Sequence, residues 1–215
     1  MPKLVILGAG SHARVVLDCL RALGRGDDVL GMIEVDGDRK RWGRRLDGCL
    51  VLGGLDRLRL ARRIGVEDAV LGYGENLKRE TLLKAAKRAG LALPAIIHPD
   101  ASVSPRAVLG EGSVILAGAV VVTGARLGAG VIVNTGATVD HDVRLGRSVH
   151  VAPGAHLAGT VRVGDRAWIG LGSCVKEGIR IGADAVIGAG AAVVRNVPKG
   201  LTVVGVPARP IGQDP

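Results

Sequence analysis

The best candidate for acid–base chemistry in this sequence is a histidine that is followed directly by an acid. His141 precedes Asp142. An imidazole titrates near neutral pH, so it can take up and release a proton under cellular conditions. A carboxylate on one ring nitrogen would fix the tautomer and stabilise the charged ring. The pair therefore has the composition of a general base with its partner, although a histidine without further context is more often a surface turn residue.

A second candidate site lies near the N-terminus, where glycines suit phosphate binding. Gly8-x-Gly10 follows the apolar run 3–7 and precedes a helical pattern. Backbone N–H groups and a helix N-terminus meet phosphate at such a place, but the same glycines also form ordinary strand-to-helix turns. Glu34 or Asp36 stands at the distance where an acid meets the ribose of a dinucleotide. A nucleotide bound as a handle fits this chain better than a redox cofactor, because a redox enzyme would need a different substrate domain.

A repeat of six residues positions the His141 pair. Sixteen aliphatic residues stand six apart from Val103 to Val193, and the fourth residue after each is small or β-branched. This period is typical of hexapeptide repeats, which coil into a parallel β-helix with one strand and one turn per hexad. Glycine often follows the aliphatic residue, and we expect it there to adopt torsions that a β-carbon would resist.

Residues 1–97 instead alternate between strand and helix patterns. Strands are expected at 3–7, 30–35, 51–53, 69–71 and 93–97. Helices are expected after residue 13, with Val15, Val16, Cys19, Leu20 and Leu23 on one face, and at 55–64 and 77–89. Such alternation indicates βαβ units and a parallel sheet. We therefore predict a Rossmann-like half domain at 1–97 and a β-helix domain at 98–215.

Composition excludes several kinds of partner. The net charge is +9, with arginines crowded at 39–45 and 57–63, but the chain has only two Trp, one Tyr and no Phe. Single-stranded nucleic acids need aromatic stacking platforms, so nucleic acid is not expected as a partner. The longest apolar run, 114–122, is too short to span a bilayer, and no signal segment begins the chain. Three cysteines without a CxxC motif indicate reduced thiols, and we expect a cytoplasmic protein that binds no membrane.

Five ordered motifs make the chain similar to one family over nearly its whole length. The chain resembles bacterial sugar O- and N-acyltransferases of the sialic acid O-acetyltransferase type, and among them the N-acetyltransferases of nucleotide-linked 4-amino sugars. The motifs are Gly8-Ala-Gly-Ser-His12, Gly74-Glu-Asn-x-x-Arg79, His98-Pro99, Asn134-Thr-Gly-Ala-Thr-Val-Asp-His-Asp142 and Gly205-Val-Pro-Ala-Arg209. The resemblance implies a left-handed β-helix with three hexads per coil, and a homotrimer with active sites at the subunit interfaces.

The resemblance also implies a reaction. Acetyl-CoA would acetylate the 4-amino group of a GDP-perosamine-type or UDP-linked amino sugar, for surface polysaccharide biosynthesis, with acetyl-CoA as co-substrate and no metal. His141 would act as general base tuned by Asp142, and the amine would attack the thioester directly. The resemblance places the nucleotide sugar on Gly10, Ser11, His12, Glu34, Asp36, Gly74 and Asn134. It places acetyl-CoA on His150, Leu171, Ala189 and Arg209. The oxyanion needs a backbone N–H donor, and we expect it at Gly159, one coil on from His141, so that Gly159 also contacts acetyl-CoA.

Two positions depart from the family pattern, and three other functions stay open. Ala189 stands where glycine is more usual, and Glu34-Val35-Asp36 stands where two adjacent acids are commoner, which leaves the nucleobase undecided. The acceptor could be a sugar hydroxyl, as in sialic acid O-acetylation. The chain could instead be a non-enzymatic scaffold, or a β-helix enzyme with a histidine-bound metal. For a metal, His150 and His156 would lie on successive faces of one chain and would not converge on one ion, unless a trimer interface combined them.

Overall fold

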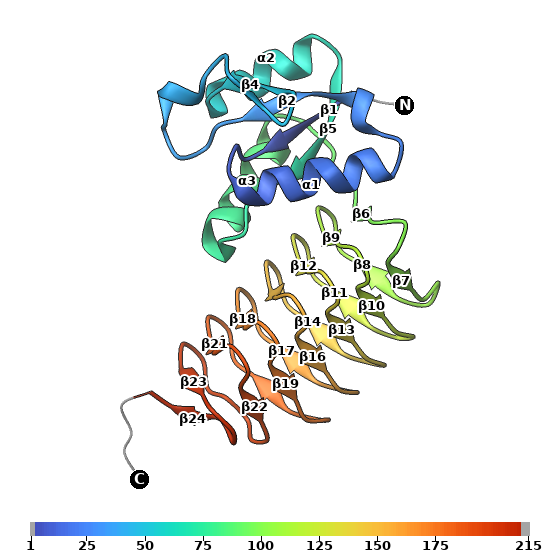
Figure 1. Cartoon of the computed structure of the whole chain (residues 1–215), viewed down its shortest axis with the longest axis vertical. Coiled ribbons are helices and arrows are strands. Elements are labelled where there is room, and N and C mark those ends of the chain that lie inside the picture. The colour runs from blue at the N-terminus through green and yellow to red at the C-terminus, as the bar shows by residue number, and fades with distance from the viewer. Residues whose placement is uncertain (1–2, 212–215) are drawn as a thin grey trace. The chain divides into compact units, whose positions relative to one another are not determined.

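The computed structural model describes residues 3–211, and the chain divides into two compact units, Met1–Pro99 and Asp100–Pro215 (Figure 1). Within the described residues, no helix has the length and apolar character needed to cross a membrane.

The first unit is built on a five-stranded sheet with the order β3-β4-β2-β1-β5. Its strands are β1 (Lys3–Leu7), β2 (Val29–Ile33), β3 (Arg45–Leu46), β4 (Cys49–Gly53) and β5 (Val66–Leu71). All neighbours in this sheet pair in parallel except β3 and β4, which form an antiparallel hairpin. The predicted Rossmann-like parallel sheet is therefore confirmed.

Three helices cover the sheet: α1 (Ser11–Ala22), α2 (Leu58–Arg63) and α3 (Asn76–Arg88). In Figure 1, α2 lies on one side of the sheet, and α1 and α3 lie on the other. Short 3-10 turns occur at η1 (Gly26–Asp28), η2 (Arg39–Arg41) and η3 (Leu55–Arg57). The buried face of α1 runs through Ala13, Val16, Leu17 and Leu20. Val15 is exposed, so its assignment to the buried face was wrong.

This unit differs from the sequence-based expectation at two further places. The last expected strand, 93–97, is reduced to β6 (Ile96–Ile97), since Pro94 has no N–H to donate to a ladder. The β3–β4 hairpin was not predicted, although Asp47-Gly48 forms its turn with positive φ at both residues. An Asp-Gly pair is a strong hairpin signal, so the sequence did carry the information.

The second unit is a parallel β-helix of two-residue strands, with β23 (Thr202–Val204) and β24 (Arg209–Pro210) at its end. The pairing of Val120 with Thr138 and of Arg126 with Arg144 shows a shift of 18 residues from coil to coil. Three hexads therefore make one coil, as expected, and left-handedness stays an expectation from the resemblance.

The strands of this unit lie on three faces. The first face carries β7 (Ser102–Val103), β10 (Val120–Val121), β13 (Thr138–Val139), β16 (His156–Leu157), β19 (Cys174–Val175) and β22 (Ala192–Val193). The second carries β8 (Val108–Leu109), β11 (Arg126–Leu127), β14 (Arg144–Leu145), β17 (Arg162–Val163) and β20 (Arg180–Ile181). The third carries β9 (Val114–Ile115), β12 (Ile132–Val133), β15 (His150–Val151), β18 (Trp168–Ile169), β21 (Val186–Ile187), β23 and β24.

The aliphatic series forms the core of the β-helix. Every member from Ile115 to Val193 is buried, whereas Val103 and Leu109 in the first coil are half-buried. The small residues of the repeat, such as Ala119 and Ala137, are also buried at the corners. Because each hexad buries its apolar side chain only against its neighbours, stacking of the coils stabilises the whole unit.

The glycines that follow the aliphatic residues serve close packing between coils. At Gly128 the backbone is ordinary, but an added β-carbon would lie 2.7 Å from the carbonyl carbon of Gly146 on the next coil. Positive φ falls two residues later in the hexad, at Gly130 and Gly136, for example, and also at Asp142. The expectation that the first glycine provides unusual torsions was therefore wrong, because its role is to let the backbones approach.

Candidate active site

His141 lies in the turn between β13 and β14, at a corner of the β-helix. Nδ1 of His141 is 3.0 Å from Oδ2 of Asp142, and the backbone N–H of His141 donates to Oδ1 of Asp140 at 2.6 Å. Asp142 adopts φ of 58°, in the left-handed region that aspartate tolerates better than most residues. This backbone conformation brings the carboxylate back onto the neighbouring ring, as the sequence predicted for the pair.

The environment of His141 suits a solvent-accessible base. Its side chain is 53% exposed. The hydrogen bond to Asp142 raises the pKa of His141 above its ordinary value, and the nearby charge of Asp140 acts in the same direction. Since Asp142 holds Nδ1, Nε2 is the nitrogen left to take a proton from a substrate.

Gly159, one coil on, lies directly against the His141 ring. A β-carbon added at Gly159 would lie 2.6 Å from Cε1 of His141 and would overlap Nε2. The backbone N–H of Thr160 donates to the carbonyl of His141 at 2.9 Å, so the two turns are stacked in register. We name residues 140–142 and 158–160 the His141 corner. Only glycine at position 159 leaves the imidazole its space.

Asn134 and His150 meet at a different corner. Nδ2 of Asn134 is 3.0 Å from Nε2 of His150, and Oδ1 of Asn134 accepts from the N–H of Thr135. An amide nitrogen only donates, so this contact assigns the acceptor role to Nε2 and the proton of a neutral ring to Nδ1. His150 is only 4% exposed and its ring centroid is 4.4 Å from that of Trp168. His150 therefore begins strand β15 with its ring buried, and it is not an exposed turn residue.

The remaining residues assigned to acetyl-CoA lie in the coils nearer the C-terminus. Leu171 and Ala189 are exposed, and the N–H of Gly190 donates to the carbonyl of Leu171 at 2.8 Å. Both residues occupy turns between the third and the first face, two and three coils after the turn of Asn134, and we name this column of turns the Asn134 corner. Arg209 is exposed on β24. The structure therefore divides the predicted residues between two successive corners of one chain.

No metal site joins these residues. Residues 3–211 contain no group of three or more His, Cys, Asp or Glu side chains that could hold a metal ion. His156 lies on β16, the face that follows that of His150, and its Nδ1 is 3.0 Å from Oγ1 of Thr138.

In the first unit, the start of α1 opens into a basic pocket. Gly10 and Ser11 line a cavity of about 510 Å³ together with four cationic side chains, which belong to Arg14, Lys40, Arg41 and Arg44. Arg14 forms a 2.6 Å ion pair with Asp47, and Arg41 donates to the carbonyl of Ala9 at 2.6 Å. A helix N-terminus surrounded by cations suits a phosphorylated ligand. Sequence reasoning missed these four residues, although the arginine cluster was visible.

The two glycines of the N-terminal motif have different roles. Gly8 has φ of 137°, and an added β-carbon would clash with the carbonyl of Gly72 on the neighbouring segment. Gly10 has an ordinary φ of −109°, and a β-carbon there would meet nothing within 4 Å. Packing within the protein therefore explains Gly8, whereas the bare backbone at Gly10 faces open space where a ligand can approach.

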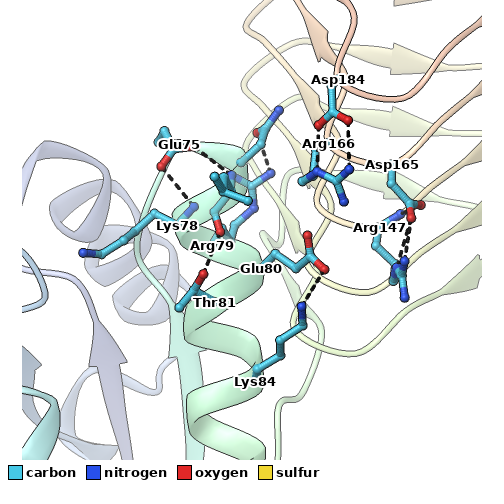
Figure 2. Close-up of polar contacts among 12 residues, drawn as sticks. Glu75, Lys78, Arg79, Glu80, Thr81, Lys84, Arg147, Asp165, Arg166 and Asp184 are labelled. Atoms are coloured by element: carbon cyan, nitrogen blue, oxygen red, sulfur yellow. Dashed lines mark hydrogen bonds and ion pairs between the residues drawn. The ribbon is translucent and has the colours of Figure 1, made fainter. Parts of the chain in front are cut away.

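A buried arginine fixes the loop that contains Gly74. Arg79 is fully buried and donates to the carbonyl of Gly74 at 2.7 Å and to Oδ1 of Asn76 at 2.9 Å. The carboxylate of Glu75 caps α3 by accepting from the N–H groups of Leu77 and Lys78 (Figure 2). Burial lowers the pKa of Arg79 to about 9, which leaves the guanidinium charged at neutral pH. The motif is therefore a structural clamp that positions Gly74.

The predicted acids and His12 also lie in this unit. Glu34 is buried and accepts from the N–H of Asp36 at 2.8 Å, while Asp36 accepts from the hydroxyl of Tyr73 at 2.8 Å. Burial, together with the charge of Arg79, lowers the pKa of His12 to about 4. The His12 ring is therefore neutral near pH 7.

Each of the two units matches a known protein family. Residues 3–86 match the PglD N-terminal domain, and residues 160–195 match the hexapeptide repeat of succinyl-transferase. The chain is similar to a perosamine N-acetyltransferase from Caulobacter crescentus, with a TM-score of 0.93 and 38% identity. That structure is a variant in which one histidine is replaced by asparagine, in complex with CoA and GDP-perosamine. The match covers 99% of this chain and 98% of that one.

Two other solved structures are also similar. For the acetyltransferase domain of PglB from Neisseria gonorrhoeae with acetyl coenzyme A, the TM-score is 0.89 and the identity 41%, over 98% of this chain and 99% of that one. WeeI from Acinetobacter baumannii gives a TM-score of 0.86 and 26% identity, over 97% and 99% of the two chains. Among curated proteins, a sequence search finds no match.

We predict that Asp142→Asn lowers the pKa of His141, because the largest cause that raises it is the hydrogen bond to Asp142. At neutral pH the neutral fraction of the imidazole would then increase. An NMR titration that follows the ring protons of His141 measures this directly. Asp140→Asn is the matched control, since its carboxylate acts on the ring only through charge and should lower the pKa less. An unchanged pKa in Asp142→Asn would contradict the geometry of the pair.

Proposed function

The chain belongs to the PglD-type hexapeptide acetyltransferases, and we propose that it transfers the acetyl group of acetyl-CoA to the 4-amino group of a nucleotide-linked amino sugar. GDP-perosamine is the first acceptor to test, because a similar enzyme of 38% identity binds it together with CoA. The observation that carries the proposal is the His141–Asp142 contact on an open corner of the β-helix.

The corner supplies what an acyl transfer to an amine needs. The amine attacks the thioester carbon, a C–N bond forms, and Nε2 of His141 takes the proton that the nitrogen loses. Asp142 stabilises the imidazolium that results. The tetrahedral intermediate collapses with loss of the C–S bond, and the proton returns from His141 to the sulfur of CoA. A backbone N–H at Gly159 is our candidate for the donor that stabilises the oxyanion.

The basic pocket at the start of α1 would hold the nucleotide part of the acceptor. Gly10, Ser11 and His12 would meet the phosphates, with Arg44 and Lys40 adding charge. Glu34, Asp36 and Gly74 would lie toward the ribose and base. The carboxylates of Glu34 and Asp36 can accept hydrogen bonds from the N–H groups of guanine or from the hydroxyls of any ribose. Because both fit, the acceptor assay below compares sugars linked to different nucleotides.

The contacts of the second substrate follow the family. His150, Leu171, Ala189 and Arg209 would bind acetyl-CoA, and Asn134 would hydrogen-bond the acceptor amine. We place the reaction in the cytoplasm, where acetyl-CoA and nucleotide sugars are available, as a step toward a surface polysaccharide.

We further propose a homotrimer whose active sites lie between subunits. His141 and Asn134 stand on two successive corners of the same coil, with strand β13 between them. A small substrate cannot contact both corners of one chain at once. It would contact both residues only where the His141 corner of one copy meets the Asn134 corner of a neighbouring copy. A closed cyclic assembly would make three equivalent sites of this kind.

The reaction is tested by measuring CoA release from acetyl-CoA with GDP-, UDP- and dTDP-linked 4-amino sugars and with free sialic acid. We expect activity on one nucleotide-linked amino sugar and a loss of about 10²–10⁴ in His141→Ala, the usual contribution of a general base. His156→Ala is the control, because this exposed histidine lies outside the proposed site. Activity on sialic acid alone would replace the proposal by O-acetylation, and no release with any acceptor would contradict it.

Shared sites predict complementation between two inactive variants. His141→Ala and Asn134→Ala, co-expressed in equal amounts, should together recover about a quarter of the wild-type activity, since random assembly combines two intact corners at about a quarter of all interfaces. The separately expressed proteins, mixed at the same total concentration before assay, give the baseline. Co-expressed protein that stays at this baseline while forming mixed oligomers would show that each site belongs to one chain.

A further inference from the structure

The second face of the β-helix carries four arginines in one column. Arg126, Arg144, Arg162 and Arg180 begin β11, β14, β17 and β20, and the strand pairing sets each opposite the next. All four are exposed. Neighbouring strands lie about 4.8 Å apart, so this arginine ladder extends over about 14 Å along the β-helix. It is a straight, dense row of positive charge.

The ladder does not stabilise the fold. Like charges directly opposite on neighbouring strands repel each other, and in residues 3–211 none of the four side chains has a hydrogen bond or ion pair. The adjoining corner is built differently: Arg147 pairs with Asp165 and Arg166 with Asp184, each at 2.7 Å (Figure 2). The repeat can therefore place an acid one coil from an arginine. At the ladder, each arginine instead has another arginine one coil away. An uncompensated row of this kind suits an anionic ligand.

The ladder also adjoins the reacting corner. Arg144 follows His141 by three residues, and Arg162 follows Gly159 by three, so both begin the strands that leave the His141 corner. Arg180 stands one coil further toward the C-terminus, and Arg126 one coil toward the N-terminus. A ligand that reacts at His141 and extends toward the C-terminal coils would pass Arg162 and Arg180.

We propose that Arg162 and Arg180 bind the phosphates of CoA, an inference that rests on the proposed function. Acetyl-CoA carries a diphosphate and a 3′-phosphate, separated from the thioester by the pantetheine arm. The phosphates must therefore lie away from His141 when the thioester is beside it. Guanidinium groups bind phosphate through paired, charge-assisted hydrogen bonds, so two adjacent arginines match a diphosphate well. The flat row supplies this charge from residues outside the family motifs.

The test compares two acetyl donors, acetyl-CoA and S-acetyl-pantetheine, which lacks all the phosphates. We expect the double variant Arg162→Gln/Arg180→Gln to raise KM for acetyl-CoA by about tenfold to a hundredfold, the effect of losing charge-assisted contacts. Its kcat/KM for S-acetyl-pantetheine and its KM for the nucleotide sugar should stay at the wild-type values. Arg126→Gln is the matched control, with the same face and exposure but on the far side of the His141 coil.

Three results would overturn the proposal: an unchanged KM for acetyl-CoA, an equal loss with both donors, or a rise in KM for the nucleotide sugar instead. Calorimetric binding of CoA alone to wild type and double variant gives an answer independent of turnover, with weaker binding expected in the variant. Loss of two like charges should leave Tm unchanged or raised, which separates a binding effect from misfolding. Failure of the proposed function itself would appear differently, as wild-type protein that releases no CoA with any acceptor.

Discussion

The stacking of coils at a fixed repeat of 18 residues is the constraint on which the β-helix depends. Each coil lies one strand spacing from the next, so each strand up to β22 faces its counterpart 18 residues on, and only the last coil differs, where Val186 pairs with Thr202. This close approach explains why glycine follows so many core aliphatic residues, since a side chain at Gly128 would collide with the next coil. It also turns single positions into columns, and those columns set the chemistry of each corner and face.

The geometry of the His141 corner is a product of this stacking. The Gly159 turn lies against the His141 ring, and the left-handed backbone at Asp142 returns its carboxylate to Nδ1. A rigid scaffold thereby fixes an exposed imidazole that would otherwise move freely, which is the main requirement for a positioned base. The first unit differs in its chemistry. Its helix N-terminus and basic pocket suit the binding of phosphate and not the transfer of a proton.

Sequence predicts most of this fold because its signals are periodic. The repeat of six identifies the β-helix and its buried residues, and alternation of strand and helix patterns identifies the first unit. The Asp47–Gly48 hairpin was available from turn chemistry and was missed. Contacts such as Asn134–His150 and the cationic pocket around Gly10 are different, because they join residues whose spacing follows no local pattern. The roles of the site residues came from family resemblance, and their grouping on two corners emerged only from the folded coil.

We infer that coil stacking holds His141 in position to act as the base, and the substitution Gly159→Ala would disturb this placement. Its methyl group would occupy the space of the imidazole, while the turn itself can accept alanine. We expect kcat to fall by about tenfold or more in the His141 background, and by no further factor when His141 is already alanine. A Gly159→Ala protein with full activity, or an equal loss in both backgrounds, would contradict the account.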